Sequence, residues 1–270
     1  MGFMSGFVEG FFFNTDNRTY WLPQHFGLKA KRFKTTAAAG HQLAGLVLES
    51  KKKDSIGTIF FFTPALYNVS FNIGQAAFLT DHGFNVLMFD YSGCGNSLGH
   101  SSIAGLLSDA QAVFGWFKQS EYYSGKVALF AQALGCDAAL QFYSKNQADV
   151  CGLALESCYA SRQGWIKDKW GPVIGDLAAS QLNIDAIEPK DVLPTIRVPL
   201  IEIFPEKDTY IHSNQKSAVF NVTPKSAEIW NVSGAKSLAV FPQSLPNQER
   251  LAHFFEKKCF KRQSNRNKNA

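Results

Sequence analysis

The sequence contains no apolar run that approaches the roughly 18–20 residues of a membrane-spanning helix, so it does not predict an integral membrane protein. Its five cysteines form no C-x-x-C pair, and its six histidines show no metal-ligand spacing. A P-loop and a G-x-G-x-x-G fingerprint are also missing. These absences predict a protein without a metal site, a disulfide framework or a nucleotide cofactor. Reduced cysteines favour a cytoplasmic location.

The 270-residue chain also carries little charge, and that charge is unevenly placed. With 46% hydrophobic residues, 18% charged residues and 24 Phe, it cannot be a disordered or fibrous chain and can fill one globular core. Residues 257–270 contain six basic side chains and no acidic one, and subtracting these six from the net charge of +5 leaves −1. The body therefore predicts no nucleic-acid surface. The basic tail, 258–270, is expected to be solvated, with contact to an anionic membrane as the alternative.

Residues 1–25 are predicted to form a Phe-rich leader arm before the body of the chain. Phe3, Phe7 and Phe11 recur at helical spacing and indicate an apolar stripe. This stripe is expected to dock on the body, with insertion at a membrane interface as the alternative. Residues 26–257 then remain for the folded domain.

Strand-like and helix-like patterns alternate along that domain. Residues 32–36 and 43–48 predict an antiparallel hairpin at the edge of a sheet. Buried strands are predicted over 58–62, 85–90, 126–130, 152–156, 198–203 and 227–232, and helices over 75–82, 103–118, 134–144 and 248–258. This alternation predicts one α/β domain with a mostly parallel sheet and helices on both faces. The stretch 157–197 is a candidate cap over the sheet, or ordinary crossover helices.

The nucleophile-elbow pattern G-x-S-x-G occurs once, at residues 95–99, and places Ser97 at its centre. An elbow needs a sharp turn from a strand directly into a helix. Ser97 instead lies seven residues after Asp90, where a strand is predicted to end, and several residues before the next helix. We therefore interpret this segment as a glycine-rich loop, with a catalytic Ser97 as the alternative.

The strand-to-helix context of an elbow occurs at residues 131–135, which read AQALG. Small residues at Ala131 and Gly135 suit a tight turn between a buried strand and a helix. The central residue, where the nucleophile would stand, is Ala133. A methyl group cannot attack a carbonyl carbon.

Four segments together resemble the α/β-hydrolase family, in its branch of small serine hydrolases related to depalmitoylases: 89–99 (FDYSGCGNSLG), 131–135 (AQALG), 199–208 (PLIEIFPEKD) and 230–237 (WNVSGAKS). The resemblance covers residues 20–257 and implies the α/β-hydrolase fold. It also implies that Ala133 stands at the nucleophile position, Asp208 at the acid position and Lys236 at the histidine position.

The same resemblance implies the position of an oxyanion hole. Thr63 and Pro64 stand where the family usually has His-Gly, and Ala65 follows as a residue whose N–H would line the hole. Leu134, directly after the nucleophile position, would supply the other N–H. An engineered Ser-to-Ala exchange would explain Ala133 alone, but would leave the histidine and the His-Gly turn in place.

A hydrolase triad acts as a unit, so the loss of both Ser and His predicts a catalytically defective protein. Such a protein would bind a small acyl-type ligand or a protein partner without a cofactor, and an ion pair between Asp208 and Lys236 is expected to fill the triad space. One alternative is an active ester or thioester hydrolase with a displaced nucleophile, Ser97 or Cys136. A third hypothesis is a peripheral membrane-surface adaptor that uses the leader arm and the basic tail.

Overall fold

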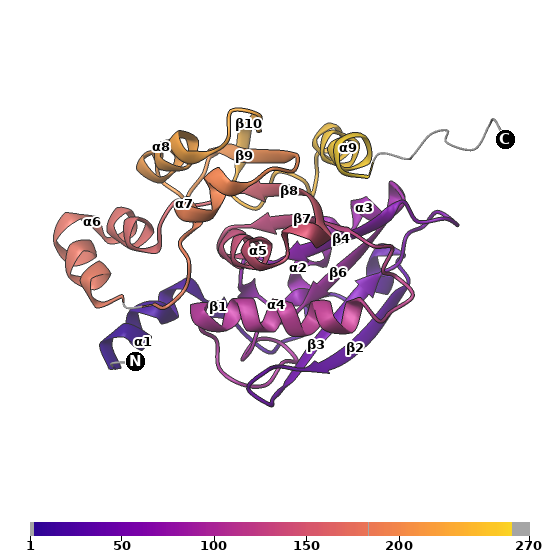
Figure 1. Cartoon of the computed structure of the whole chain (residues 1–270), viewed down its shortest axis with the longest axis horizontal. Coiled ribbons are helices and arrows are strands. Elements are labelled where there is room, and N and C mark those ends of the chain that lie inside the picture. The colour runs from indigo at the N-terminus through magenta and orange to yellow at the C-terminus, as the bar shows by residue number, and fades with distance from the viewer. Residues whose placement is uncertain (1–2, 183, 261–270) are drawn as a thin grey trace.

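The computed structural model describes residues 3–182 and 184–260 and is built on one eight-stranded sheet (Figure 1). The strands lie in the order β10-β9-β8-β7-β4-β6-β3-β2. Their bounds are β2 (Ala30–Thr36), β3 (Gln42–Leu48), β4 (Gly57–Phe62), β6 (Phe84–Phe89), β7 (Val127–Gln132), β8 (Val150–Glu156), β9 (Leu200–Lys207) and β10 (Glu228–Lys236). The strands from β10 to β6 pair in parallel, while β3 is antiparallel to both β6 and β2. The predicted parallel sheet with an antiparallel edge hairpin is confirmed.

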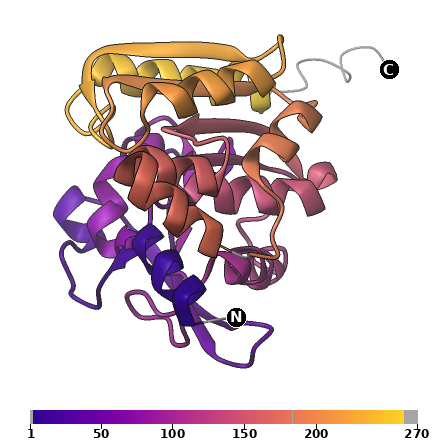
Figure 2. The same ribbon diagram turned by 90° about the vertical axis from the view of Figure 1, so that its left-hand side faces the viewer.

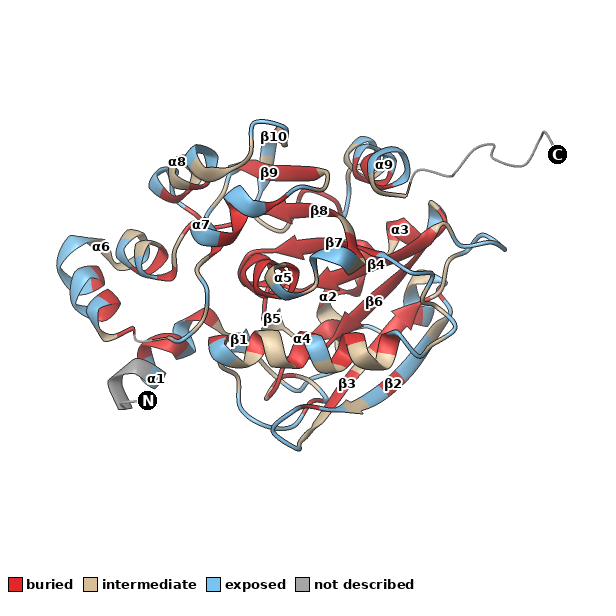
Figure 3. Cartoon of the chain, in the orientation of Figure 1, coloured by how far each residue is buried: buried red, intermediate tan, exposed pale blue. Residues whose placement is uncertain are grey.

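Helices cover both faces of the sheet, as the alternation of patterns predicts. Their bounds are α1 (Phe3–Glu9), α2 (Val69–Ala76), α3 (Phe78–Asp81), α4 (Ile103–Phe117), α5 (Leu134–Lys145), α6 (Arg162–Gln181), α7 (Pro189–Val192), α8 (Ser213–Val222) and α9 (Leu245–Phe254). One face packs against α4, α5 and α8, and the other against α2, α3 and α9. Figure 3 shows the strands and the inward sides of these helices buried.

Phenylalanine fills much of the space between the layers. Every residue of β4 is buried, because this strand lies in the middle of the sheet with helices on both sides. Phe60 packs against Phe89 and Phe142 on one face, and Phe61 stacks on Phe130 on the other. Phenylalanine side chains therefore supply much of the core on both faces of the sheet.

The helix expected over 75–82 begins earlier than predicted, at Val69, and is divided in two at Ala77. Asn68 caps its first turn, because the Asn68 side-chain oxygen accepts a hydrogen bond from the Ser70 N–H at 2.9 Å. The helical periodicity is weak over this first turn, so the sequence does not predict that the helix begins at Val69.

The leader packs on the body with a different face from the one predicted. Val8 and Phe12 are buried, whereas Phe7 and Phe11 are exposed, so the expected docking of the Phe stripe is wrong for both of these residues. Phe3 lies at the start of α1. After α1, the short strand β1 (Asn14–Thr15) pairs in parallel with β5 (Leu66–Tyr67), just beyond β4. The leader is thus an integral layer of the domain, and it runs across the carboxyl ends of the central strands.

The stretch 157–197 contains α6 and α7, and α6 is kinked at Gly171, where φ is 75° and ψ is 177°. Figures 1 and 2 place α6 beside α1, at the edge of the molecule away from α9. We call α1 and α6 together the cap. Within the described part of the chain, no helix is long and apolar enough to cross a membrane.

Candidate functional site

The turn from β7 into α5 has the backbone of a nucleophile elbow. Ala133 lies at φ 53° and ψ −122°, a region that residues other than glycine rarely occupy. Its N–H donates to the carbonyl of Glu156 at 2.9 Å, which fixes the turn to β8. A Cβ on Gly135 would lie 2.2 Å from the Phe62 carbonyl oxygen, so only glycine allows α5 to start this close to β4. The strained turn is present, but its side chain is a methyl group that is 1% exposed.

The predicted oxyanion turn follows β4 and lies directly against this elbow. The Thr63 carbonyl oxygen would be 2.6 Å from a Cβ on Gly135, which brings 63–65 and the start of α5 together. Thr63, Pro64, Ala65 and Leu134 are all buried. Ala65 has φ 53°, and its carbonyl oxygen accepts a hydrogen bond from the Asn14 N–H at 3.1 Å. The leader therefore forms a hydrogen bond with the turn that is predicted to line an oxyanion hole.

Asp208 follows β9, at the position predicted for the triad acid, and both oxygens of its carboxylate accept hydrogen bonds. One oxygen, Oδ2, accepts from the Ser157 hydroxyl at 2.6 Å. The other, Oδ1, accepts from the Ser237 hydroxyl at 2.6 Å and from the N–H groups of Tyr210 and Ile211 at 2.8 and 3.1 Å. Among the described residues, Asp208 has no imidazole partner.

Lys236 ends β10 and is exposed, and the expected ion pair with Asp208 is not formed among the described residues. The reason lies in the strand itself. The register between β10 and β9 shifts between Val232 and Lys236, and Gly234 has a φ of 70°. Lys236 is exposed at the end of this irregular stretch, and the next residue, Ser237, reaches the carboxylate instead.

A buried carboxylate missed in the sequence holds the loop after Lys236 against the elbow. Glu156, at the end of β8, accepts from the Gln132 side-chain amide at 2.6 Å and from the Leu238 N–H at 3.0 Å. Burial raises the pKa of Glu156 to about 7, although both hydrogen bonds act to lower it. Gln132 and Glu156 each close a buried apolar strand at its carboxyl end. A polar residue at the carboxyl end of a buried apolar strand is the sequence signal that could have identified both residues.

The two candidates for a displaced nucleophile are both held inside the structure. The Ser97 hydroxyl donates to the Asp90 carbonyl at 2.6 Å and accepts from the Ala44 N–H at 2.9 Å, so it joins the glycine-rich loop to β3. Cys136 lies in the first turn of α5, and its thiol donates to the Glu156 carbonyl at 3.3 Å. Burial raises the pKa of the Cys136 thiol, which disfavours the reactive thiolate.

A serine that sequence reasoning overlooked lies within hydrogen-bond distance of an imidazole. The Ser92 hydroxyl is 2.6 Å from His41 Nε2 and 2.7 Å from Asp109 Oδ1, and the Ser92 N–H donates to Asp109 Oδ2. In a hydrolase triad the imidazole lies between serine and acid, whereas here the serine lies between the other two. Ser92 and Asp109 are also buried. This arrangement anchors the glycine-rich loop to α4 and lacks the proton path of a triad.

Within residues 3–182 and 184–260, no three His, Cys, Asp or Glu side chains gather as metal ligands.

Comparison with known proteins agrees with this architecture. The family model described as "Serine aminopeptidase, S33" matches residues 71–186. An uncharacterized Escherichia coli protein, YfhR, is 30% identical over 156 residues, 56% of this chain and 54% of that protein. Protein bem46 of Schizosaccharomyces pombe is 26% identical over 182 residues, 66% of this chain and 60% of bem46. The chain thus spans little more than half the length of these relatives.

Among solved structures, an esterase of Pyrococcus furiosus, Pf2001, superposes with a TM-score of 0.71 at 18% identity, over 92% of this chain and 98% of the esterase. The chain shares the α/β-hydrolase fold.

Proposed function

We propose that this chain is a catalytically silent α/β-hydrolase-like protein that acts by binding a small ligand or a protein partner. One observation carries the proposal: the elbow backbone is preserved around Ala133, which offers no atom that can attack a carbonyl. A triad without its serine or its histidine loses on the order of 10⁶ in turnover in the subtilisin example. Here both groups are missing from their positions.

The surroundings of Ala133 support the same proposal. Asp208 accepts hydrogen bonds from two serine hydroxyls and two backbone N–H groups, and no imidazole is among its partners in the described part of the chain. The leader binds the Ala65 carbonyl through Asn14, which restrains the turn that would accommodate an oxyanion. A binding protein of this kind would retain the fold for its surfaces and pockets.

We expect the purified chain to hydrolyse p-nitrophenyl acetate and butyrate no faster than buffer, and to remain unlabelled by a fluorophosphonate probe. Ala133→Ser is expected to be equally silent, because the new hydroxyl would have no base to take its proton. Turnover of either protein that the probe blocks would refute the proposal. In that event Ser92→Ala, Ser97→Ala and Cys136→Ala would identify the nucleophile by the variant that loses turnover.

A second candidate function is a peripheral membrane contact, and an apolar patch on the cap favours it. The patch consists of Phe7, Phe11, Val173, Ile174 and Leu177, whose exposed fractions are 42–81%. Phe11 packs edge-on against Trp170 at 4.4 Å between ring centroids, so α1 and α6 present one continuous surface. Such clusters mark interaction sites rather than the scattered apolar residues of an ordinary surface.

The basic tail is less well placed for the same contact. Lys257 and Lys258 follow α9, which Figure 1 shows on the side of the molecule opposite α1 and α6. The remaining basic residues of the tail, Lys261, Arg262, Arg266 and Lys268, lie outside the described residues. The membrane proposal therefore rests on the cap patch, with the exposed Lys167 and Lys169 beside it to meet anionic lipid.

We expect the full chain to co-sediment with vesicles of phosphatidylcholine and phosphatidylserine, and Val173→Glu/Leu177→Glu to lower the bound fraction at least about tenfold. Two carboxylates would have to be buried in place of two aliphatic side chains, each worth about 1.5–3 kcal/mol. Phe220→Glu/Leu245→Glu is the matched control, because these two residues are as exposed but lie outside the cap. Equal loss in both pairs, or no binding by the parent chain, would rule out the cap as the membrane contact.

A further inference from the structure

A pocket of about 510 Å³ lies away from Ala133, between the hairpin β2–β3, helix α2 and the part of the leader after β1. This volume falls in the range of small-molecule sites in proteins. No residue of the elbow, of the oxyanion turn or of the Asp208 cluster lines it. It is therefore a separate site, and its chemistry is given by its own lining.

One wall of this edge pocket is apolar, while Thr19, Ser70 and Asn96 also line the pocket. Leu46 of β3 faces α2, because residues along a strand alternate between the two faces of the sheet. Val69 and Ile73 lie one turn apart on α2 and face Leu46 across the pocket. At the rim stands the indole of Trp21, which is 48% exposed. An alkyl chain would find aliphatic walls here and an aromatic ring at the entrance.

Two cations line the pocket beside these walls. Arg32 and Lys34 are two residues apart on β2, so their side chains lie on the same face of the sheet, while Phe33 between them faces α4 and stacks on Trp116. Within residues 3–182 and 184–260, the Arg32 guanidinium and the Lys34 ammonium form neither a hydrogen bond nor an ion pair. Both are free to receive an anion.

The carboxylate in the lining does not neutralise these cations. Asp90 is buried at the end of β6, and its two oxygens accept from the backbone N–H groups of Val69 and Asn96 at 2.8 and 3.0 Å. A Cβ on Gly95 would lie 2.3 Å from the Asp90 carboxylate, so the glycine-rich loop closes tightly over it. Burial raises the pKa of Asp90, while its two hydrogen bonds and the charge of Arg32 act to lower it. The pocket therefore combines an apolar wall with two cations at one edge.

We propose that this edge pocket binds a single-chain fatty carboxylate, with the carboxylate on Arg32 and Lys34 and the alkyl chain along Leu46, Val69 and Ile73. A guanidinium offers two parallel N–H donors that match the two oxygens of a carboxylate, and the neighbouring ammonium adds a second charge. The inference deepens the proposed function, because it supplies a ligand class and a site for a protein that acts by binding.

The test is a titration of the full chain with decanoate by isothermal titration calorimetry, beside decanol, decyl phosphate and acetate. We expect saturable binding of decanoate, binding of decanol at least about tenfold weaker, and no detectable binding of acetate, because both the charge and the chain are needed. Decyl phosphate tests the head group: if it binds while decanoate does not, the assignment to a carboxylate is overturned.

Variants locate the site. Arg32→Gln/Lys34→Gln is expected to weaken decanoate at least tenfold while leaving decanol unchanged. Lys31→Gln is the matched control, because Lys31 lies on the same strand with its side chain on the opposite face, and it should bind decanoate as the parent does. Binding that survives loss of both Arg32 and Lys34, or that Lys31→Gln weakens equally, overturns the inference. Ester hydrolysis measured on the same preparations separates this failure from a failure of the proposed function.

Discussion

Arg162→Met is expected to lower the free energy of unfolding by about 3–5 kcal/mol, because it leaves the Asp137 carboxylate buried without a counter-charge. A loss of that size is a large part of the 5–15 kcal/mol that stabilises a typical protein. Urea denaturation followed by circular dichroism would show it as a lower midpoint with an unchanged slope.

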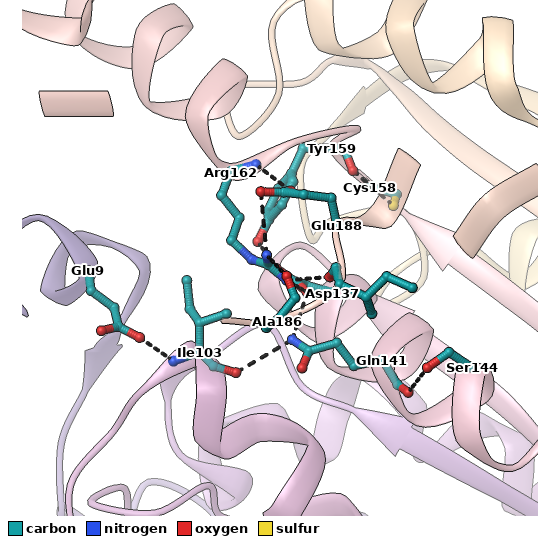
Figure 4. A network of polar contacts seen from close by, with 11 residues as sticks. Glu9, Ile103, Asp137, Gln141, Ser144, Cys158, Tyr159, Arg162, Ala186 and Glu188 are labelled. Atoms are coloured by element: carbon teal, nitrogen blue, oxygen red, sulfur yellow. Dashed lines mark hydrogen bonds and ion pairs between the residues drawn. The ribbon is translucent and has the colours of Figure 1, made fainter. Parts of the chain in front are cut away.

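The size of this effect follows from how completely Arg162 is used (Figure 4). Its Nε and Nη2 donate to the two oxygens of Asp137 at 2.8 and 2.7 Å, with both side chains almost wholly buried. Its remaining N–H groups reach the carbonyls of Ala186 and Ile187 and the carboxylate of Glu188. Four of the five donors of the guanidinium form hydrogen bonds and Glu188 adds an ion pair at 3.4 Å, a geometry that lysine cannot reproduce.

Three further variants define the mechanism of that loss. Arg162→Lys should recover only part of the stability, since it keeps the charge without the planar set of donors. Arg162→Met/Asp137→Leu should be more stable than Arg162→Met, because the stranded carboxylate is gone. Lys167→Met breaks an exposed pair with Asp176 on the same helix and should cost less than about 1 kcal/mol. An Arg162→Met protein within 1 kcal/mol of the parent would mean that water reaches Asp137.

This network also connects the cap to the candidate site. Asp137 lies in the first turn of α5, four residues after Ala133, and Arg162 is the first residue of α6. The Tyr159 hydroxyl and the Gln141 amide complete the partners of Asp137 at 2.7 and 2.9 Å. Buried charge thus fixes the start of α6 to the first turn of α5, while Val173, Ile174 and Leu177 farther along α6 are exposed.

The layered fold could be predicted because the apolar residues of each strand and helix are spaced as that type of element requires. The strands predicted over 58–62 and 126–130 are buried from Thr58 to Phe62 and from Val127 to Phe130, as central strands require, and the segments 32–36 and 43–48 pair as the predicted edge hairpin. The leader could not be predicted in the same way. Phe7, Val8, Phe11 and Phe12 are all apolar, and which of them dock depends on α1 lying against α6, a contact distant in sequence.

The candidate site likewise has one part that the sequence predicts and one part that it does not. The elbow could be predicted because it depends only on the small residues between one strand and the helix that follows. Ala133 does lie in the strained conformation. The sequence does not predict the partner of Asp208, because that partner depends on an irregularity in the pairing of β10 with β9 near Gly234. The register shifts by two residues between Val232 and Lys236, and Ser237, directly after the strand, reaches the acid.

Glu202→Met is expected to raise the free energy of unfolding at both pH 5 and pH 8, by roughly 3 kcal/mol more at pH 8 than at pH 5. Glu202 is a fully buried residue of β9, and neither of its carboxyl oxygens has a hydrogen-bond partner among the described residues. Burial alone raises the pKa of Glu202 to about 8. A thioether of similar size would fill the same space without a polar group to desolvate.

The sign of the pH dependence follows from this pKa. In the unfolded chain the carboxyl ionises near its ordinary value of 4.5, whereas in the folded protein it keeps its proton until about pH 8. Between these values the unfolded state binds fewer protons, so the stability of the parent protein falls as the pH rises. Glu156, whose pKa is raised to about 7, adds to the fall over the same range.

Denaturation midpoints of the parent and of Glu202→Met, measured from pH 5 to pH 8, separate the two carboxyls. The variant should lose the share of the slope that belongs to Glu202 and keep the share of Glu156. Glu206→Gln is the matched control on the same strand, because Glu206 is exposed and hydrogen bonds from the Gly234 N–H and the Ser233 hydroxyl lower its pKa. It should give no gain at pH 8. If Glu202→Met also gives none, an ionised Glu202 must be stabilised by groups other than those the fold places around it.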